Sequence, residues 1–569
     1  MTHPHRPPSA RRSSPLLALA LCAIGAPATA QTVAPPNIGN ALKQTQPTPP
    51  APAPQAPAPM IVEQETPALS LPAGETLLVR EFRFEGDSLI AADDLQAAVA
   101  AYKGRQLSMA DIEGAAAKVT ALYRSRGYLV ARAYVPRQDA SAGTLTIHVR
   151  IGKFGQFTLA NHSLVRDGVL RRSFAGLQAE PAIARASLER AMLLVGDMPG
   201  AQMPRLTLSP GQAPGSSDFD VDVGAGQRFG GYALVDNAGS RSTGQTRLST
   251  ELRVDSPLGI ADRLTLDAMG VGGGGLVNGR LAYSLPVGAS GLRAELAGSR
   301  TSYDLGGAYS DLDANGQAHT VEGMLSYPLL RSRSHNLNLS LGLAARRLRD
   351  HIAASDVLNP RKADVATLTL QDERWGGLLG HDGYADVNLG LSVGDLRLDD
   401  AAQKALNQAG ARTSGKYARL NLGLAGSLVL GRDWSASASL AVQKALHNKN
   451  LDTSEQMSLS GSSGVIAYRE SVTGDDGYLF NAGLHYALPA LAGISHTLGA
   501  FADIGRVRLE DGAYATLTGT QLSDLGLAYE AHRGALSLKL QLAHAVGGLP
   551  PTVAQDGRTR LVAQAAAVF

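Results

Sequence analysis

Thiols are nearly absent from this sequence: its single cysteine, Cys22, lies in an N-terminal segment that we predict to be removed on export. A mature chain without thiols suits an exported protein that enters an oxidising compartment. Long apolar stretches are absent as well, because no run of about 18 apolar residues follows that segment, and this argues against membrane-spanning helices. The formal net charge is only +2, so nucleic acid is not an expected partner.

Aromatic residues are scarce, at 5% of the chain, and Trp375 and Trp434 are the only tryptophans. Transmembrane β-barrels usually carry girdles of aromatic residues, so this scarcity counts against a barrel unless an alanine-rich composition explains it. Glycine is abundant, with 63 residues, which is high for a helical protein and suits a protein made of hairpins.

Catalytic and metal-binding patterns are also missing. His148 and His162 lie apart, and no His-x-x-x-His or paired-cysteine spacing occurs. The stretch Gly461–Gly464 lacks the strand-to-helix context of a nucleophile elbow. Asp475 and Asp476 could bind a cation, but we interpret them as part of a solvated loop. We therefore expect no enzyme, no cofactor and no metal site.

The first 30 residues predict a secretory signal peptide. A basic stretch that ends at Arg12 precedes the apolar segment Leu16–Ile24, and Ala28–Ala30 forms an A-x-A cleavage site. The mature chain would then begin near Gln31. A soluble exported protein would carry the same signal, so the signal alone does not assign a compartment.

Residues 31–74 predict a short helix and a linker. The stretch from Pro35 to Pro72 is rich in proline, alanine and glutamine, and we expect an extended linker there. Before the densest prolines, Asn37 to Gln44 could form one helix with Ile38 and Leu42 on the same face. A helix of this length is marginal unless it docks against something.

Residues 75–152 and 153–225 show one order of elements twice: strand, helix, helix, strand, strand. A capping box at Ser108–Asp111 starts the second helix of the first unit, and Gly127 ends it. The predicted elements are the strands 77–85, 128–135 and 144–151 with helices at 95–102 and 108–127, then the strands 154–159, 205–208 and 218–223 with helices at 165–174 and 186–195.

In residues 226–569, short segments of alternating apolar and polar residues replace the helical spacing of apolar residues, apart from a predicted helix at 401–408. In Leu536–Leu542 every second residue is leucine and the residues between are polar, which predicts a strand with one apolar and one polar face. The 344 residues of this stretch are too many for a usual β-sandwich domain, but they would form about 16 antiparallel transmembrane strands with their turns and loops. The final segment Leu561–Phe569 is typical of a last barrel strand, and we predict that Phe569 is its assembly signal.

Several blocks resemble one family, the two-partner secretion transporters of the haemolysin and filamentous-haemagglutinin secretion type. The first repeat is similar to that family's first POTRA domain, and the second repeat to its second. The first match includes Tyr123, Gly127, Tyr128, Pro136 and Gln138, within Phe82–Gly86, Leu122–Tyr128 and Val135–Asp139; the second rests on Leu188–Leu194 and Asp197–Gly200. The resemblance covers the chain from about Asn37 to Phe569.

Two barrel motifs belong to the same resemblance. The strand motif Phe501-x-Asp503-x-Gly505 is similar to the Phe-x-Asp-x-Gly motif of the superfamily. The lumen-loop motif Val465-Ile466-Ala467-Tyr468 resembles the tip of a long loop folded into the barrel, where the family has an arginine in place of Ile466. That arginine normally reaches the aspartate, here Asp503. Either Arg469 takes its place, or Asp503 pairs elsewhere or faces water.

The resemblance implies an outer-membrane protein with periplasmic POTRA domains that secretes a large partner exoprotein without nucleotide hydrolysis. It also implies contact with outer-membrane lipid and with the barrel assembly machinery. The helix Asn37–Gln44 resembles the family's plug helix, although an ordinary loose terminus is an alternative. Two further functions remain open on the sequence: an assembly factor that inserts other barrels, and a porin-like channel.

Overall fold

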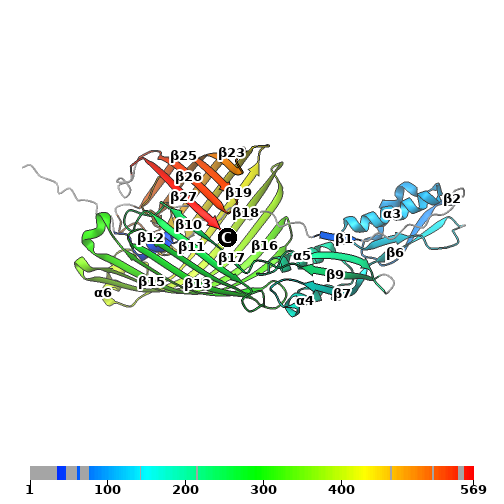
Figure 1. Cartoon of the computed structure of the whole chain (residues 1–569), viewed down its shortest axis with the longest axis horizontal. Coiled ribbons are helices and arrows are strands. Elements are labelled where there is room, and N and C mark those ends of the chain that lie inside the picture. The colour runs from blue at the N-terminus through cyan, green and yellow to red at the C-terminus, as the bar shows by residue number, and fades with distance from the viewer. Residues whose placement is uncertain are drawn as a thin grey trace, which may run out of the picture. The chain divides into compact units, whose positions relative to one another are not determined.

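The computed structural model describes residues 35–45, 60–63, 76–140, 142–212, 216–461, 464–515, 518–548 and 557–569 (Figure 1). Pro36–Phe569 form one unit. The predicted signal peptide, with Cys22, lies outside the described residues.

A small α+β unit follows the linker and contains the first predicted repeat. Its central sheet has the order β3-β6-β5, with β3 parallel and β5 antiparallel to β6. The side chain of Ser108 accepts a hydrogen bond from Asp111 N, and Asp111 Oδ2 accepts one from Ser108 N, so the expected capping box starts α3. The elements are β2 (Thr76–Val79), β3 (Glu81–Gly86), α2 (Ala92–Val99), the 3-10 helix η1 (Ala100–Tyr102), β4 (Arg105–Ser108), α3 (Met109–Ser125), β5 (Ala131–Tyr134) and β6 (Thr144–Ile151).

The first unit differs from the prediction in its strands. The single strand expected at 77–85 is broken at Arg80, whose N–H donates to Gly143 O at 2.7 Å instead of continuing a ladder. The first half, β2, pairs with β4, a four-residue strand that the pattern did not indicate. The strand expected at 128–135 is shorter, because Tyr128 makes only an isolated bridge to Ala184.

The second unit repeats this topology. Its sheet has the order β1-β8-β9-β7, with β7 parallel and β8 antiparallel to β9. The additional strand β1 (Met60–Glu63) comes from the linker and pairs in parallel with β8. The other elements are β7 (Lys153–Asn161), α4 (Asp167–Ala175), the 3-10 helix η2 (Gly176–Ala179), α5 (Arg185–Gly196), β8 (Arg205–Pro210) and β9 (Ser216–Val223).

The rest of the chain closes into an antiparallel barrel of sixteen strands, which confirms the predicted fold class. Each strand pairs with its neighbour in sequence, and β10 pairs with β27 to close the cylinder. The strands are β10 (Phe229–Asp236), β11 (Arg247–Asp255), β12 (Arg263–Val271), β13 (Leu276–Pro286), β14 (Arg293–Asp304), β15 (Ala314–Arg331), β16 (His335–Ile352), β17 (Val357–Leu378), β18 (His381–Leu398), β19 (Gly415–Val429), β20 (Trp434–Ala445), β23 (Asp476–Leu491), β24 (Ile494–Arg508), β25 (Gly519–Arg533), β26 (Leu536–Ala545) and β27 (Thr559–Val568).

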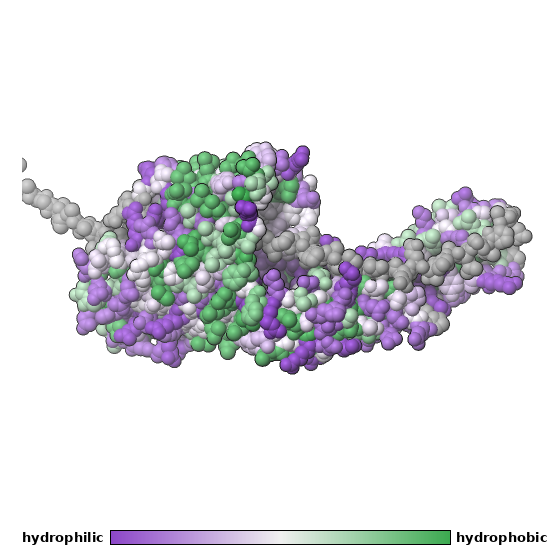
Figure 2. Space-filling view, in the orientation of Figure 1, coloured by the Kyte–Doolittle hydropathy of each residue, from purple (hydrophilic) through white to green (hydrophobic). Residues whose placement is uncertain are grey.

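Side chains alternate between the two faces of the barrel wall. On β14, Leu296 is 64% exposed on the outside, whereas its neighbour Ala297 is 4% exposed. Figure 2 shows a hydrophobic surface over part of the barrel, and the exposed large apolar side chains of the barrel strands are mostly leucines. Inside, Arg280 bridges Asp267 and Glu295, so this part of the wall is charged. Among the described residues, no helix is long and apolar enough to cross a membrane.

Each of the two tryptophans packs on a tyrosine of the neighbouring barrel strand. Trp375 packs on Tyr384 with ring centroids 5.2 Å apart, and Trp434 packs on Tyr486 at 4.9 Å. Trp375 lies near the end of β17 and Trp434 at the start of β20, so both lie near strand ends. Trp434, which is 46% exposed, matches the interfacial girdle of transmembrane barrels, whereas Trp375 faces inward beside Asn336 and Glu373.

Short elements lie between the barrel strands. The predicted helix at 401–408 is α6, which begins at the side-chain cap of Asp400. The other elements are the 3-10 helices η3 (Gly307–Leu312) and η4 (Ala353–Ser355), α6 (Ala401–Ala409), and the two-residue strands β21 (Met457–Ser458) and β22 (Thr473–Gly474).

Candidate functional site in the barrel lumen

The segment 446–475, here the lumen loop, connects β20 with β23 and packs against the inside of the barrel wall. Asp475 and Asp476 hold its base, and both are buried, at 0% and 4% exposure. Asp475 accepts hydrogen bonds from Leu451 N at 2.9 Å and Glu510 N at 3.0 Å. The interpretation of this pair as a solvated loop was therefore wrong, because backbone N–H groups satisfy the carboxylates in place of water.

The tip of the lumen loop is buried against the last five barrel strands. Val465, Ile466, Ala467 and Tyr468 are each 6% exposed or less. They share an apolar cluster with wall residues that include Leu479, Val507, Leu522, Ala543 and Val562. The loop motif is thus docked in the lumen although Ile466 replaces the family's arginine.

Backbone groups of the tip take the place of that arginine in binding the wall. Ala467 N donates to Asp524 Oδ2 on β25 at 2.6 Å. Arg560 on β27 is 2% exposed, and its Nη1 donates to the carbonyls of Ile466 and Tyr468, each at 2.9 Å. A guanidinium can satisfy several acceptors in one plane, so Arg560 clamps the backbone on both sides of Ala467. The positive charge comes from the wall, not from the loop.

The strand motif points its three defining residues into the lumen. A Cβ on Gly526 would lie 2.1 Å from Phe501 Cζ, so the glycine makes room for the ring. A Cβ on Gly505 would lie 2.7 Å from Leu459 Cδ2, so this glycine makes room for the lumen loop. Asp503, which lies between Phe501 and Gly505 in the sequence of β24, is 5% exposed. The motif therefore shapes the wall on which the loop docks.

Asp503 contacts Asn481 and Asp524 in the barrel wall. Its Oδ1 accepts a hydrogen bond from Asn481 Nδ2 at 2.7 Å, and it lies directly opposite Asp524 in the β24–β25 register. Arg469, the alternative partner, donates instead to Gln245. Asp503 Oδ2 and Asp524 Oδ1 are both buried. Because two adjacent buried carboxylates repel each other, one proton shared between them is the arrangement that satisfies both oxygens.

A second set of ionic contacts anchors the stem of the lumen loop. Asp452 Oδ2 accepts a hydrogen bond from Arg361 Nη1 on β17 at 2.8 Å. Arg361 also binds Asp350 on β16, and all three side chains are at most 11% exposed. Glu455 is fully buried and binds Arg346 and Arg419. Buried carboxylates need such partners, so the stem is held by arginines of the barrel wall.

Helix α1 (Ile38–Gln44) packs between this stem and the wall. Ile38 N donates to Asp350 Oδ1 at 2.8 Å, and Arg247 Nη1 donates to Gln44 O at 3.0 Å. The helix approaches the loop through Gly39, since a Cβ there would lie 2.5 Å from both Ser454 N and Thr453 Oγ1. These contacts give a seven-residue helix the docking that its length requires.

Lys43 extends from α1 to the lumen loop, where its Nζ binds the carbonyl of Gln456. Burial lowers the pKa of Lys43 to about 8, against the opposing effect of the Glu455 carboxylate. Asp350 accepts a hydrogen bond from α1 and also binds Arg361, so α1 and the loop stem share one ionic cluster. Among the described residues, no group of three His, Cys, Asp or Glu side chains could hold a metal ion.

The predicted POTRA motif residues organise the fold of the first unit. Tyr123 is fully buried, and its hydroxyl donates to Asp87 O at 3.1 Å. Gly127 has φ +94°, which suits glycine just after a helix, and Tyr128 packs 5.9 Å from Tyr123. Gln138 follows Pro136 and Arg137. Its side-chain amide accepts a hydrogen bond from Thr146 N and donates one to Thr146 O, as the backbone of a neighbouring strand would.

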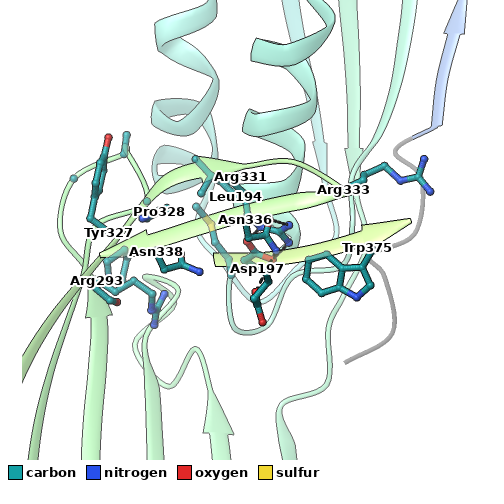
Figure 3. Close-up of a pocket in the computed structure, with 17 residues that line it drawn as sticks. Leu194, Asp197, Arg293, Tyr327, Pro328, Arg331, Arg333, Asn336, Asn338 and Trp375 are labelled. Carbon is teal, nitrogen blue, oxygen red and sulfur yellow. Dashed lines mark hydrogen bonds and ion pairs between the residues drawn. The ribbon is translucent and has the colours of Figure 1, made fainter. Parts of the chain in front are cut away.

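The second POTRA motif, Asp197–Gly200, contacts the barrel. Arg331 on β15 donates twice to Asp197, at 2.7 Å for each oxygen (Figure 3). Ser256 Oγ donates to Pro199 O at 2.7 Å, and Gly200 has φ +85° with Leu164 and Ser256 packed around its Cα. Beside these contacts is a cavity of about 370 Å³, lined among others by Leu194, Arg293, Tyr327 and Trp375.

The C-terminal residue continues the barrel seam. Phe569 exchanges backbone hydrogen bonds with Gly231, at 2.9 and 3.0 Å, directly after the β10–β27 pairs. Its side chain is 57% exposed. A terminal aromatic residue at the seam is thus available at the outer face of the barrel.

The contact between Phe501 and Gly526 leads to a prediction about barrel stability. Gly526→Ala should destabilise the folded barrel by roughly 1–3 kcal/mol, because the new Cβ overlaps a rigid ring and the Leu542 carbonyl. The measurement is the temperature at which the folded band is lost on unheated gels. Gly298→Ala on β14 is the matched control, since a Cβ there meets nothing within 4 Å. Equal melting of the two variants would contradict this role of Gly526.

Comparisons with known proteins agree with this architecture. The family model described as haemolysin secretion/activation protein ShlB/FhaC/HecB matches residues 215–526, and the POTRA domain model of ShlB type matches residues 77–152. This chain belongs to the haemolysin secretion/activation protein family. Members of the family are outer-membrane β-barrels with periplasmic POTRA domains that secrete partner exoproteins, and this chain is one of these transporters.

The family relationship extends over most of the chain. The heme/hemopexin transporter protein HuxB of Haemophilus influenzae is 28% identical over 405 residues, which is 71% of both chains. The outer membrane transporter CdiB of Dickeya dadantii is 29% identical over 208 residues, 37% of this chain and 36% of that one. The solved structure of CdiB from Escherichia coli has the same fold, with a TM-score of 0.70 at 20% identity over 90% of this chain and 94% of that one.

Several lumen residues were not found from the sequence. Asp524, Arg560 and Arg361 stand on strands whose inward face cannot be assigned without the register. Asp452 and Glu455 lie in a polar stretch that reads as an ordinary loop. The sequence did offer one clue. Side chains alternate between the two faces of a barrel strand, so a charged residue next to an outward-facing leucine points inward, as Arg560 does beside Leu561.

Proposed function

We propose that the secreted partner crosses the outer membrane through the barrel lumen after α1 has left it, and that the lumen loop stays docked to the wall. The observation that supports this most is the shared cluster around Asp350, which places a removable seven-residue helix beside a loop that is anchored twice. The helix is held through Ile38 and Ala41 in an apolar cluster of the wall and through hydrogen bonds within a single stretch of seven residues, whereas the loop has both a buried stem and a buried tip. The helix is therefore the easier element to displace.

The chemistry of the lumen suits transport without nucleotide hydrolysis. An extended chain needs hydrated, polar walls that do not bind it tightly, and charged inward residues such as Arg280 and Glu295 provide such a wall. Folding of the partner outside the cell would then make each step irreversible. The POTRA domains would receive the partner in the periplasm, the leucine-rich outer face would contact lipid, and Phe569 would be recognised by the barrel assembly machinery.

Co-expression with a large exoprotein encoded beside this gene tests the proposal. Exoprotein should appear in the medium when the full chain is present and remain in the periplasm when it is absent. Release without the transporter would contradict the proposal. The amounts of other outer-membrane barrels are measured in the same cells, because a general assembly defect would lower them and a loss of secretion alone would not.

The replaced arginine gives a direct prediction. Ile466→Arg should raise the unfolding temperature of the barrel, because its guanidinium would pair with the two buried carboxylates Asp503 and Asp524, which lie directly opposite each other. Secretion should stay within about twofold of the parent, since Arg560 already holds the tip. Ile466→Met is the control for side-chain size. A large gain in secretion would mean that the missing arginine limits transport.

A further inference from the structure

A row of basic residues crosses five neighbouring barrel strands. The backbone register places Arg300 of β14 opposite His319 of β15, and His319 opposite Arg347 of β16. The row continues with Lys362 of β17 opposite Arg347, and with Arg397 of β18 opposite Lys362. Residues that lie opposite each other in a ladder share one face of the sheet, so five successive strands each contribute a basic side chain to the same face.

The side chains of this basic row point away from the lumen. Arg346, the residue before Arg347, binds Glu455 of the lumen loop, so Arg347 faces the opposite side of the wall. Arg347 also shares its face with Leu343, which is 56% exposed. All five residues of the row are exposed, whereas Leu348, the residue after Arg347, is buried. The row therefore belongs to the outer face of the barrel.

The basic row lies toward the extracellular end of the barrel. The POTRA domains are periplasmic and β9 leads into β10, so β10 begins at the periplasmic end. Because the strands alternate in direction, β14 and β16 run outward, and Arg300 and Arg347 lie in their outer halves. In Figure 2 hydrophilic residues border the hydrophobic surface on the side where Figure 1 shows α6, the helix between β18 and β19.

The charge of the row is compensated on β17 and β18 but not on β14 and β16. The two members on β17 and β18 each bind an aspartate of the chain. Among the described residues, no carboxylate lies within ion-pair distance of Arg300, Arg347 or Arg349, and Arg300 donates to the neutral amide oxygen of Gln317 at 3.4 Å. Arg349 is exposed on the same face as Arg347, two residues further along β16. With strands about 4.8 Å apart and about 3.4 Å per residue, the Cα atoms of these arginines lie within roughly 12 Å of one another.

A dip in the apolar outer surface adjoins the three arginines. Gly298 lies opposite Val321, and Gly323 lies between Leu296 and Leu343 in the register. The three large side chains are 64%, 59% and 56% exposed at Leu296, Val321 and Leu343, whereas a Cβ at either glycine would meet nothing within 4 Å. Gly298 is two residues from the first arginine of the row, so the dip begins directly beside the positive charge.

We propose that the outer face of β14, β15 and β16 is a binding site for a phosphorylated glycolipid of the outer leaflet. The lipid phosphates bind Arg300, Arg347 and Arg349, because guanidinium groups donate paired hydrogen bonds to phosphate oxygens. An acyl chain of the same lipid lies in the dip at Gly298 and Gly323. Positive side chains beside an apolar surface favour an anionic lipid over a soluble anion, since the lipid satisfies both. The site does not depend on which protein is secreted.

Titration of the purified full-length transporter with phosphorylated lipid A tests the proposal. Bound lipid is measured by native mass spectrometry in detergent, and folding is checked by the unfolding temperature on gels. The combined variant Arg300→Gln, Arg347→Gln and Arg349→Gln should bind at least about tenfold more weakly, because it loses the charged donors. A second variant with lysine at the same three positions keeps the charge and should bind within about threefold of the parent.

The matched control removes three positive charges from the periplasmic end of the barrel. Arg374 lies near the end of β17, Arg432 lies in the turn between β19 and β20, and Arg533 ends β25; all three are exposed. Their combined change to glutamine should leave lipid binding unchanged. A loss as large as that in the first variant would show that the overall charge of the protein attracts the lipid, and would overturn the proposal.

Two further measurements on the parent identify the ligand. Dephosphorylated lipid A with the same acyl chains should bind at least about tenfold more weakly than the phosphorylated form. Inorganic phosphate at the same concentration should leave the unfolding temperature unchanged. Equal binding of the two lipids, or equal binding by the parent and the glutamine variant, would overturn the proposal. Stabilisation by inorganic phosphate as large as that by the lipid would assign the arginines to a soluble anion and overturn it as well.

Discussion

Arg361→Ala should destabilise the barrel more than any other single substitution in the lumen. Removal of this guanidinium leaves Asp350 and Asp452 buried and without their shared cation. Breaking a buried ion pair in this way costs roughly 3–5 kcal/mol, because the remaining charge is neither solvated nor paired. We expect a lower unfolding temperature, a loosened lumen loop and a loss of secretion, measured on gels and in the secretion assay.

An exposed arginine on the neighbouring strand is the control. Arg397 binds Asp364 on the surface, with side chains 53% and 54% exposed, so Arg397→Ala should change stability by about 1 kcal/mol at most. A second comparison separates charge from packing: Asp350→Asn with Asp452→Asn should recover part of the stability lost in Arg361→Ala. If the double substitution weakens that variant further, unpaired charge is not the cause.

Gly39→Val should open the pore. Its Cβ would lie 2.5 Å from Ser454 N, a backbone atom of the anchored loop stem, so neither partner can move aside cheaply. The seven-residue helix would leave the lumen, because it cannot persist in a shifted position without its docking contacts. We expect single-channel conductance in planar lipid bilayers to rise several-fold, with the unfolding temperature of the barrel nearly unchanged.

The control for this variant carries the same substitution on the wall. Gly298→Val lies on β14, one of the strands that α1 contacts, at a position where a Cβ meets nothing within 4 Å. Its conductance should equal that of the parent. An unchanged conductance for Gly39→Val, with helix α1 still protected from protease, would show that Gly39 does not set the fit of the plug.

The features that the sequence predicted well are those that depend on nearby residues. The capping box at Ser108 involves an aspartate three residues away, and β6 follows the alternation of its own eight residues. The barrel itself follows from repeated alternation along the chain. Short strands were missed for the same reason: β4 and β1 have four residues each, and only their partners in the sheet define them.

The lumen site depends on contacts between distant residues, which a single sequence does not show. Arg361 and Asp452 are 91 positions apart, and Arg560 and Ile466 are 94 apart. Whether such a residue faces the lumen depends on the register of its strand, because a shift of one residue moves it to the lipid face. Asp475 was misread because polarity alone does not distinguish a hydrated carboxylate from one that accepts backbone N–H groups.

The position of the barrel seam determines when the cylinder can close. Strand β10 must wait for β27, the barrel strand that lies furthest from it along the chain, and Phe569 continues the pairing with Gly231. A chain truncated before this point would present two unpaired strand edges to the membrane, each with backbone groups that lipid cannot satisfy. Closure therefore depends on one strand: until β27 has paired with both β10 and β26, the cylinder keeps open edges that a bilayer cannot accommodate.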